Sequence, residues 1–362
     1  MAKQRDSGFE LLRIIAMLMV VAHHFAFHNA VDLFGLPFSA QRVLFEVLFR
    51  GVGKIGVICF FMISVCFLSE KQQSLRSSLR RVWIMERELL FWSVVAYAYV
   101  RFTAPGIIDK NFKWRILQPL TLNMWWYATF YAVFLALLPF VQIGLGSLGR
   151  SRHRELCIVS IVMVMIIEGC HAKDTLDLGN VTSFILLYAM LVYYRWYMKP
   201  LPKWVGLILI AVSMAVVTAF ANVYGRVSPV DDRFVYQAFL MDNRKLPMIV
   251  AAFGLLIIFS QIHFRNGMIN RIASAAFGVY LISDHPLIRE LLWQKWFTLD
   301  KVYDQPCALA LLESMGIVLL VFAVCTALDL LRQLLFRVTV DRHRGRWFDR
   351  LWPSACDLTE PA

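Results

Sequence analysis

Residues 9–25 read FELLRIIAMLMVVAHHF, an apolar run that contains Glu10, Arg13, His23 and His24. The run continues to about residue 28, so one helix of this length can cross a bilayer core of roughly 30 Å. An arginine inside such a helix costs about 2.5–3.5 kcal/mol on insertion scales, and it should therefore face the protein interior beside a partner. Glu10 lies three residues earlier, within reach on the same helical face. The segment predicts a first membrane helix with a polar stripe.

The composition of the whole chain agrees with a membrane location. Of 362 residues, 59% are hydrophobic and 17% are charged, and the mean hydropathy is +0.60. Soluble domains carry about 25% charged residues. The apolar residues come in blocks of about twenty, the length of a membrane-spanning helix. This pattern excludes a soluble enzyme, a disordered chain and a small secreted domain held by disulfides.

The apolar blocks predict an all-α, polytopic membrane helix bundle with about ten transmembrane helices. Lys and Arg concentrate in the loops on the side of the N-terminus, which favours both termini in the cytoplasm (N-in/C-in). Arg13 is the one basic residue that this segmentation assigns to a span. We expect an integral-membrane domain over residues 1–335 and a basic cytoplasmic tail over 336–362. The predicted spans are 9–28, 52–68, 88–104, 120–141, 155–168, 181–198, 204–221, 246–262, 272–288 and 309–331.

The net charge of +12 does not require a nucleic-acid partner. Membrane proteins accumulate Lys and Arg in their cytoplasmic loops, and a basic balance follows from that alone. The seven cysteines are odd in number and their spacing matches no metal motif. We therefore expect no nucleic acid, no disulfide framework and no metal site.

The polar stripe on the first predicted helix has a defined geometry. His24 follows Arg13 by eleven positions, which places both on one face, about 16 Å apart along the axis. His28 continues this stripe by one more turn, whereas His23 points roughly 80° away. The stripe suits an anion-binding group at one end and a proton acceptor deeper in the membrane. The alternative is that Arg13 snorkels to the headgroups while His24 makes a packing hydrogen bond.

This stripe resembles the N-terminal signature of the membrane acyltransferase-3 family, in which an acidic residue, an arginine, ten residues and a histidine follow one another. Glu10, Arg13 and His24 occupy these positions. Other blocks resemble the family's in the same order, over about residues 9–331. They are GVICFFMIS at 56–64, NMWWY at 123–127 with Tyr131 and Leu138-Pro139, and FGVYLI at 277–282.

The chain departs from the family pattern at two positions. Val65 replaces the usual glycine after Ser64, and Ser283 stands where the family commonly has a histidine. His285, beside Pro286, could substitute for that histidine.

The resemblance implies a multi-pass membrane enzyme of the cell membrane. Such an enzyme moves an acyl group, most often acetyl, from cytoplasmic acyl-CoA to a hydroxyl of a cell-surface polysaccharide or lipid-linked glycan. His24 would be the general base, Arg13 would bind the donor or orient the histidine, and Glu10 would be the partner of Arg13. Acyl-CoA would be a substrate, and no bound cofactor is implied. The oligomeric state is left open.

Several other residues are weaker candidates for substrate binding. Ser64 could be a nucleophile, but a packing role is favoured. Trp125 and Trp126 are interpreted as an interfacial pair, with sugar stacking as the alternative. Asp284 and His285 would form a second acid–base pair if buried, and would be hydrated if exposed. The remaining candidates are Arg80, Arg81 and Arg87 for the donor, and Glu168 and His171, which we interpret as a solvated loop.

Two rival functions remain open at this stage. Intramembrane Arg and His residues also mark transport paths, so a transporter or flippase of a glycan or small anion is the first alternative. Transporters often contain inverted repeats, and the sequence shows none. The second alternative is a regulatory protein built on a degenerate acyltransferase scaffold.

Overall fold

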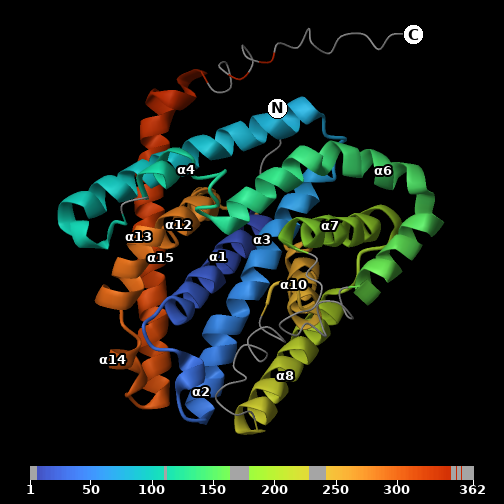
Figure 1. The fold of residues 1–362 in the computed structure, drawn as a ribbon. Helices are drawn as coiled ribbons and strands as arrows, with labels where there is room; N and C mark the ends of the chain where they lie inside the picture. The colour runs from blue at the N-terminus through green and yellow to red at the C-terminus, as the bar shows by residue number, and fades with distance from the viewer. Residues whose placement is uncertain are drawn as a thin grey trace.

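The computed structural model describes residues 6–109, 112–163, 179–227, 242–343, 348 and 352. Within these residues every regular element is a helix, and no strand is present (Figure 1). The principal helices are α1 Ser7–Phe27, α2 Ala40–Phe45, α3 Val52–Leu68, α4 Leu75–Thr103, α5 Phe112–Leu117, α6 Trp126–Met163, α7 Gly179–Tyr197, α8 Lys203–Val227, α10 Leu246–Phe259, α11 Gly267–Ser274, α12 Ala276–Ser283, α13 Pro286–Leu291, α14 Asp300–Tyr303 and α15 Cys307–Val338. Short 3₁₀ and π turns are η1 Leu33–Gly35, η2 Glu46–Gly51, η3 Pro105–Ile107, η6 Leu292–Trp296 and η7 Val340–His343.

Helix α1 lies at the centre of the bundle, packed against α3, α12 and α15 (Figure 1). Asp6 caps its first turn by accepting a hydrogen bond from the Gly8 N–H at 3.0 Å. Two glycines of α3, Gly53 and Gly56, let the two helices approach closely. A side chain at Gly53 would meet the Met19 carbonyl oxygen at 2.9 Å, and one at Gly56 would meet the Met19 Cβ at 3.0 Å. Small residues at helix crossings serve this purpose in membrane proteins.

Five of the described helical segments are long and apolar enough to cross a membrane. They are Ser7–Phe27, Ala40–Leu68, Trp126–Met163, Lys203–Arg226 and Cys307–Val338. Helix α10 is apolar but shorter, and α7 is not among the five. The structure thus supports a polytopic helical membrane protein, whereas the predicted count of ten spans and the orientation of the termini stay predictions.

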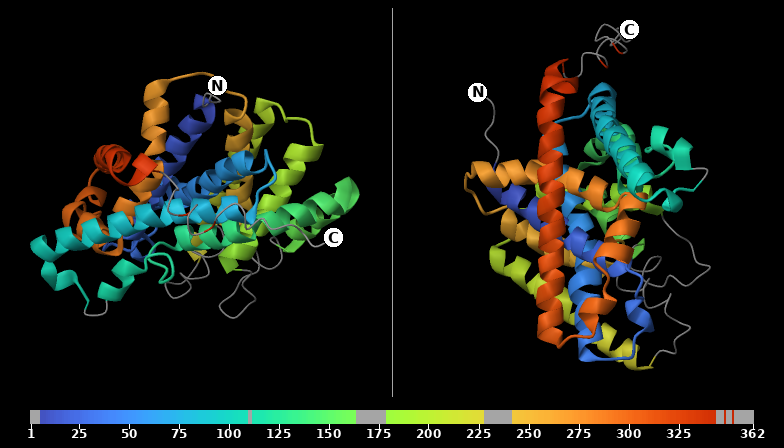
Figure 2. Two further views of the ribbon diagram at one scale, coloured as in Figure 1. Left: turned by 90° about the horizontal axis from the view of Figure 1, so that it is seen from above. Right: turned by 90° about the vertical axis from the view of Figure 1, so that its left-hand side faces the viewer.

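Helix α4 differs from the predicted span 88–104. It begins at Leu75 and runs across one end of the bundle rather than along it (Figures 1 and 2). Four arginines lie in its first half, at positions 76, 80, 81 and 87, and it is not among the membrane-length apolar helices. A 29-residue helix with this charge is long enough to span but too polar in its first half to do so at low cost.

Helix α6 joins the predicted spans 120–141 and 155–168 into one bent element. Its bend lies at Gly149, which adopts φ 67° and ψ 174°. This left-handed conformation is strained for residues with a Cβ. The described part of α6 ends at Met163.

The predicted span 272–288 is broken into α11, α12 and α13. The break between α12 and α13 falls at Asp284 and His285, and Pro286 opens α13. Proline is tolerated in the first turn of a helix but cannot continue a preceding one. This break lies beside α1 and decides the position of the Asp284 side chain.

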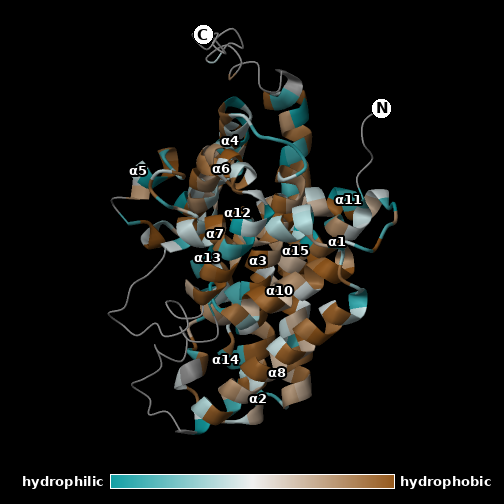
Figure 3. Ribbon diagram, turned by 90° about the vertical axis from the view of Figure 1, so that its right-hand side faces the viewer, coloured by the Kyte–Doolittle hydropathy of each residue, from teal (hydrophilic) through white to brown (hydrophobic). Residues whose placement is uncertain are grey.

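Helices α8 and α15 form the periphery of the bundle. Large apolar side chains on both are exposed, including Val223 at 65% and Leu312 at 71%. Figure 3 shows the hydrophobic colouring of α8 and α10 on the lower part of the molecule, with more hydrophilic segments gathered near α4 and α11. Exposed apolar surface of this extent fits contact with lipid tails.

The close contact of α1 with α3 predicts different outcomes for two glycine-to-alanine changes. Gly53→Ala places a methyl group against the backbone of α1, and overpacking of this kind costs about 1–3 kcal/mol. Gly316→Ala on α15 meets open space, and alanine is the better helix former. In detergent, Gly53→Ala should lower the thermal midpoint and Gly316→Ala should leave it unchanged or raise it. Equal midpoints for the two variants would contradict this packing.

Candidate active site

The first polar pair of α1 is a salt bridge between Arg13 and Glu10. Arg13 Nη1 donates to Glu10 Oε2 at 2.5 Å, and the Glu10 side chain is 3% exposed. The arginine side chain is 21% exposed, so the pair lies at the edge of a solvent-accessible space. The predicted pairing of these two residues is therefore present.

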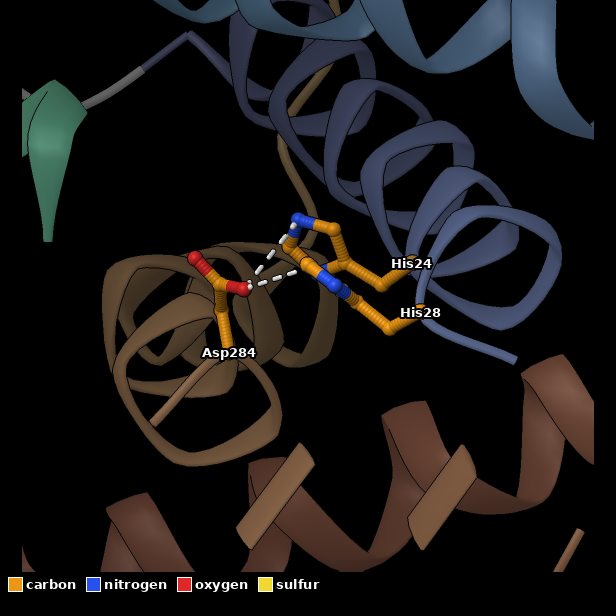
Figure 4. Close-up of side chains that lie close together, drawn as sticks. All are labelled: His24, His28 and Asp284. Carbon is orange, nitrogen blue, oxygen red and sulfur yellow. Dashed lines mark hydrogen bonds and ion pairs between the residues drawn. The ribbon is translucent and has the colours of Figure 1, made fainter. Parts of the chain in front are cut away.

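Three side chains converge at the other end of α1: His24, His28 and Asp284 (Figure 4). Asp284 Oδ1 lies 3.1 Å from His28 Nε2 and 3.8 Å from His24 Nε2. His24 is 6% exposed and Asp284 is 4% exposed. His24 Nδ1 is buried and has no hydrogen-bond partner among the described residues. One carboxylate thus faces two imidazoles, and one imidazole nitrogen is left free for a further partner.

The interruption of the helix between α12 and α13 brings Asp284 to this position. Asp284 is the C-cap of α12, and His285 is the N-cap of α13, where its Nδ1 accepts the Leu287 N–H at 3.2 Å. His285 is fully buried, whereas Arg289, one turn into α13, reaches back to Asp284 Oδ1 at 3.5 Å. The break therefore directs the carboxylate toward α1 and assigns His285 a capping role.

A cavity of about 360 Å³ contains this cluster, and we call it the histidine cavity. His24, His28 and Asp284 line it, together with two cationic side chains. Aromatic residues supply much of the remaining wall. They are Phe27, Phe60, Trp126, Tyr127, Phe277 and Tyr280.

A second cavity, of about 610 Å³, lies at the Arg13 end of α1, and we call it the arginine cavity. Arg13, Arg332 and Arg337 line it, and Glu88 and Asp341 supply two acidic groups. Three guanidinium groups around one space favour an anionic ligand, since they match phosphate and carboxylate oxygens in geometry.

Arg332 is held in place by a buried network on α15. Its Nε lies 2.7 Å from Asp329 Oδ1, and Glu88 lies 3.5 Å from its Nη2. Asp329 is fully buried and also accepts the indole N–H of Trp92 at 3.1 Å. A side chain at Gly278 of α12 would collide with Asp329. The network therefore orients the guanidinium before any ligand binds.

The two cavities share two lining residues, Phe60 of α3 and Phe277 of α12. Arg13 lines only the arginine cavity of the two, and His24 lines only the histidine cavity. Both residues belong to one helix, so α1 runs past both spaces. The site consists of two adjoining chambers of different chemistry, with the two phenylalanines between them.

The structure separates the weaker sequence candidates into two groups. Trp126 lines the histidine cavity and Ser64 lines the arginine cavity. Ser64 Oγ donates to the Phe60 carbonyl at 3.2 Å, and it does not share a cavity with His24, the expected base. Trp125 and His285 are fully buried and line neither cavity. Full burial is inconsistent with the interfacial interpretation of Trp125, and the hydrated alternative for His285 is wrong.

The basic residues of α4 do not reach the arginine cavity. Arg81 Nη1 donates to Gln73 Oε1 at 2.6 Å, and Arg87 pairs with Asp341 at 3.0 Å. Neither residue lines the cavity, and neither does Arg80. Arg332 and Arg337 of α15 line this cavity instead of the arginines of α4. Glu168 and His171 lie outside the described residues.

Sequence reasoning missed four residues that line the two cavities: Lys54, Arg289, Arg332 and Arg337. Asp284 was weighed together with His285, and the structure places the aspartate, not the histidine, beside His24. Lys54 of α3 lies within a predicted span, as do Arg101 and Arg195, so the assignment of Arg13 as the only basic residue in a span was wrong. The position of Lys54 within the predicted span 52–68 was the available signal. Arg289 and Arg332 lay close to the predicted ends of spans and gave no periodic signal.

The residues His24, His28 and Asp284 are of the types that bind zinc. Their ligand atoms all lie within 4.8 Å of one another. However, the Arg289 guanidinium already lies 3.5 Å from the same carboxylate oxygen, and Lys54 lines the same cavity. A guanidinium beside the carboxylate and an ammonium in the same cavity disfavour a divalent metal ion there. The group fits better as a carboxylate that stabilises charge on the imidazoles.

Comparison with known proteins agrees with this geometry. The model of the family described as an acyltransferase domain, acyltransferase-3, matches residues 6–330. No curated protein and no solved structure gives a significant match. The matched segment contains α1 with Arg13 and His24, the broken α12–α13 region and most of α15. The family assignment supports an enzyme over the transporter alternative, and the chain belongs to the acyltransferase-3 family of membrane acyltransferases.

Proposed function

We propose that this membrane acyltransferase moves an acetyl group from acetyl-CoA to a hydroxyl of a cell-surface polysaccharide or a lipid-linked glycan. The observation that carries the proposal is the pair of adjoining cavities along α1. One is lined by three arginines and the other contains His24 beside Asp284. A reaction between an anionic donor and a hydroxyl acceptor needs these two environments within reach of each other.

The arginine cavity suits the donor. CoA carries several phosphate charges, and arginine binds phosphate by paired hydrogen bonds. Arg13 is fixed by Glu10 and Arg332 by Asp329, so both guanidinium groups are oriented before binding. The thioester end of the pantetheine arm would then pass Phe60 and Phe277 toward His24.

In this proposal His24 acts as the general base. The acceptor hydroxyl donates its proton to a ring nitrogen of His24 while its oxygen attacks the thioester carbonyl. A C–O bond forms, the C–S bond then breaks, and the CoA sulfur leaves with the proton returned by the imidazolium. The products are an acetyl ester and CoA thiol, so atoms and charge balance.

Asp284 stabilises the transient positive charge on His24. Its carboxylate lies 3.8 Å from His24 Nε2, and the hydrogen bond to His28 and the ion pair with Arg289 hold it in place. A buried carboxylate at this distance favours the protonated imidazole electrostatically. Asp284 therefore lowers the barrier to proton removal without itself contacting the substrate.

Substitution of Arg13 and His24 on α1 tests the donor and base roles. His24→Ala should abolish acetyl transfer because the proposed base is removed, and Arg13→Ala should do so because the donor is no longer held. Both proteins should still insert and accumulate. The measurement is transfer of radiolabelled acetyl from acetyl-CoA to extracted surface glycan by purified protein. His263→Ala, on an exposed histidine, is the matched control, and normal transfer by His24→Ala would refute the assignment.

Asp284→Asn keeps the size of the side chain and removes its charge. General-base assistance contributes about 10²–10⁴-fold to rate, so loss of the stabilising charge should lower kcat by about 100-fold. The KM for acetyl-CoA should stay close to the wild-type value because Asp284 does not line the arginine cavity. A rise in this KM with an unchanged kcat would assign Asp284 to donor binding instead.

Arg337→Gln tests the donor cavity without disturbing the buried Asp329 network. Arg337 is exposed and lines the cavity, so its loss should raise the KM for acetyl-CoA about 10-fold, the value of one charged hydrogen bond. The kcat should change little. Arg271→Gln, on an exposed arginine of α11, serves as the control; an equal effect of both changes would show that only net charge matters.

A further inference from the structure

Lys54 is a cation in the histidine cavity that the proposed chemistry does not use. It lies on α3, is half-buried, and its ammonium is 5.8 Å from the centroid of the Phe27 ring. Within the part of the chain that the structure describes, Lys54 forms no ion pair and no hydrogen bond. An ammonium group withdrawn from water without a counter-charge is costly, and such groups are usually paired.

The carboxylates that act on Lys54 electrostatically are Asp242 and Asp284, and each is engaged elsewhere. Asp242 lies 3.2 Å from Arg244. Asp284 faces His24, His28 and Arg289. Among the described residues, the wall around Lys54 therefore holds more positive charge than its carboxylates neutralise.

Arg289 supplies a second cation at the same end of the cavity. Its side chain is 38% exposed, and it approaches Asp284 at 3.5 Å. Together with Phe27 and His28 it also lines a further cavity of about 310 Å³, which we call the vestibule. Because these three residues line both spaces, the vestibule adjoins the histidine cavity.

Lys54 and Arg289 lie on the opposite side of His24 from Arg13. Phe27, whose ring centroid lies 5.8 Å from the Lys54 ammonium, follows His24 by one turn of α1, whereas Arg13 precedes His24 by about three turns. A molecule held by these cations would therefore approach His24 from the end of α1 that faces away from the arginine cavity.

We propose that the acceptor is acidic: it carries a carboxylate or phosphate near the reacting hydroxyl, and Lys54 binds that group while Arg289 attracts it at the vestibule. This inference rests on the proposed acyl transfer and specifies its substrate class. The anionic group neutralises Lys54, and the aromatic wall that includes Trp126 contacts the sugar faces. The other source of an anion is a dicarboxylic acyl group, whose free carboxylate would extend past His24.

The first experiment measures binding and does not require turnover. Purified His24→Ala protein is titrated with surface polysaccharide from the cells that make the protein, in native, carboxyl-reduced and dephosphorylated forms. One of the two treatments should weaken binding about 10- to 100-fold, the value of a charged hydrogen bond. Lys54→Met should weaken binding of the native polymer by the same factor. Its binding should then not change further when the acidic group of the polymer is removed. Equal binding of all three forms would overturn the proposal.

Two variants control for altered folding and for net charge. Lys54→Arg keeps the charge and should retain the preference for the acidic polymer. Lys203→Met removes an exposed lysine at the start of α8 and should behave like the parent protein. Thermal midpoints of all variants establish that they are folded. If Lys203→Met also lost the preference for the acidic polymer, the effect would come from the overall charge of the protein. That result would refute a site at Lys54.

A second experiment separates the two sources of the anion. Wild-type and Lys54→Met proteins are compared with acetyl-CoA and with succinyl-CoA on the same native polymer. An acidic acceptor predicts that Lys54→Met raises the KM for the polymer with both donors. A selective loss of succinyl transfer, with polymer binding unchanged, would place the anion on the acyl group and overturn the proposal. Acid-selective binding without any acyl transfer would instead refute the proposed function alone.

Discussion

The structure depends on one electrostatic constraint: ionisable groups in an apolar bundle must be paired or placed beside a cavity. Arg13 meets it through Glu10 at one end of α1, and Arg332 meets it through Asp329 on α15. At the other end of α1, Asp284 is shared by two imidazoles and Arg289. Each pair lies at the wall of a cavity, so the same interactions that make burial tolerable also orient groups that can act on a ligand.

Two local features of the backbone create this arrangement. Gly53 and Gly56 allow α3 to pack directly on α1, which brings Lys54 and Phe60 to the cavities on either side of the contact. The break before Pro286 ends α12 at Asp284 and turns its carboxylate toward His24. A continuous helix through this region would lack the interruption between α12 and α13 that directs the Asp284 carboxylate. The irregular segment is therefore the feature that completes the site.

Local periodicity was sufficient to predict part of the site. The pairing of Glu10 with Arg13 and the common face of Arg13 and His24 both follow from helix geometry along one segment. The partner of His24 could not be predicted in this way, because Asp284 is 260 positions away and its approach depends on tertiary packing.

The hydropathy of a single segment also leaves out its tertiary context. Residues 88–104 are apolar enough to suggest a span, yet they continue a helix whose first half carries four arginines, and α4 runs across the end of the bundle. Lys54 was overlooked as a basic residue of the predicted span 52–68 because it stands near the start of that apolar block. Its place in the cavity wall depends on the packing of α3 against α1, which a single-segment pattern does not contain.

The central claim is that donor and acceptor meet at His24 from opposite ends of α1. The most direct measurement uses the purified protein in sealed liposomes, with radiolabelled acetyl-CoA enclosed and the surface polysaccharide supplied outside. Label should appear on the external polymer while the vesicles retain their acetyl-CoA. Transfer that requires both substrates on the same side of the membrane would contradict it.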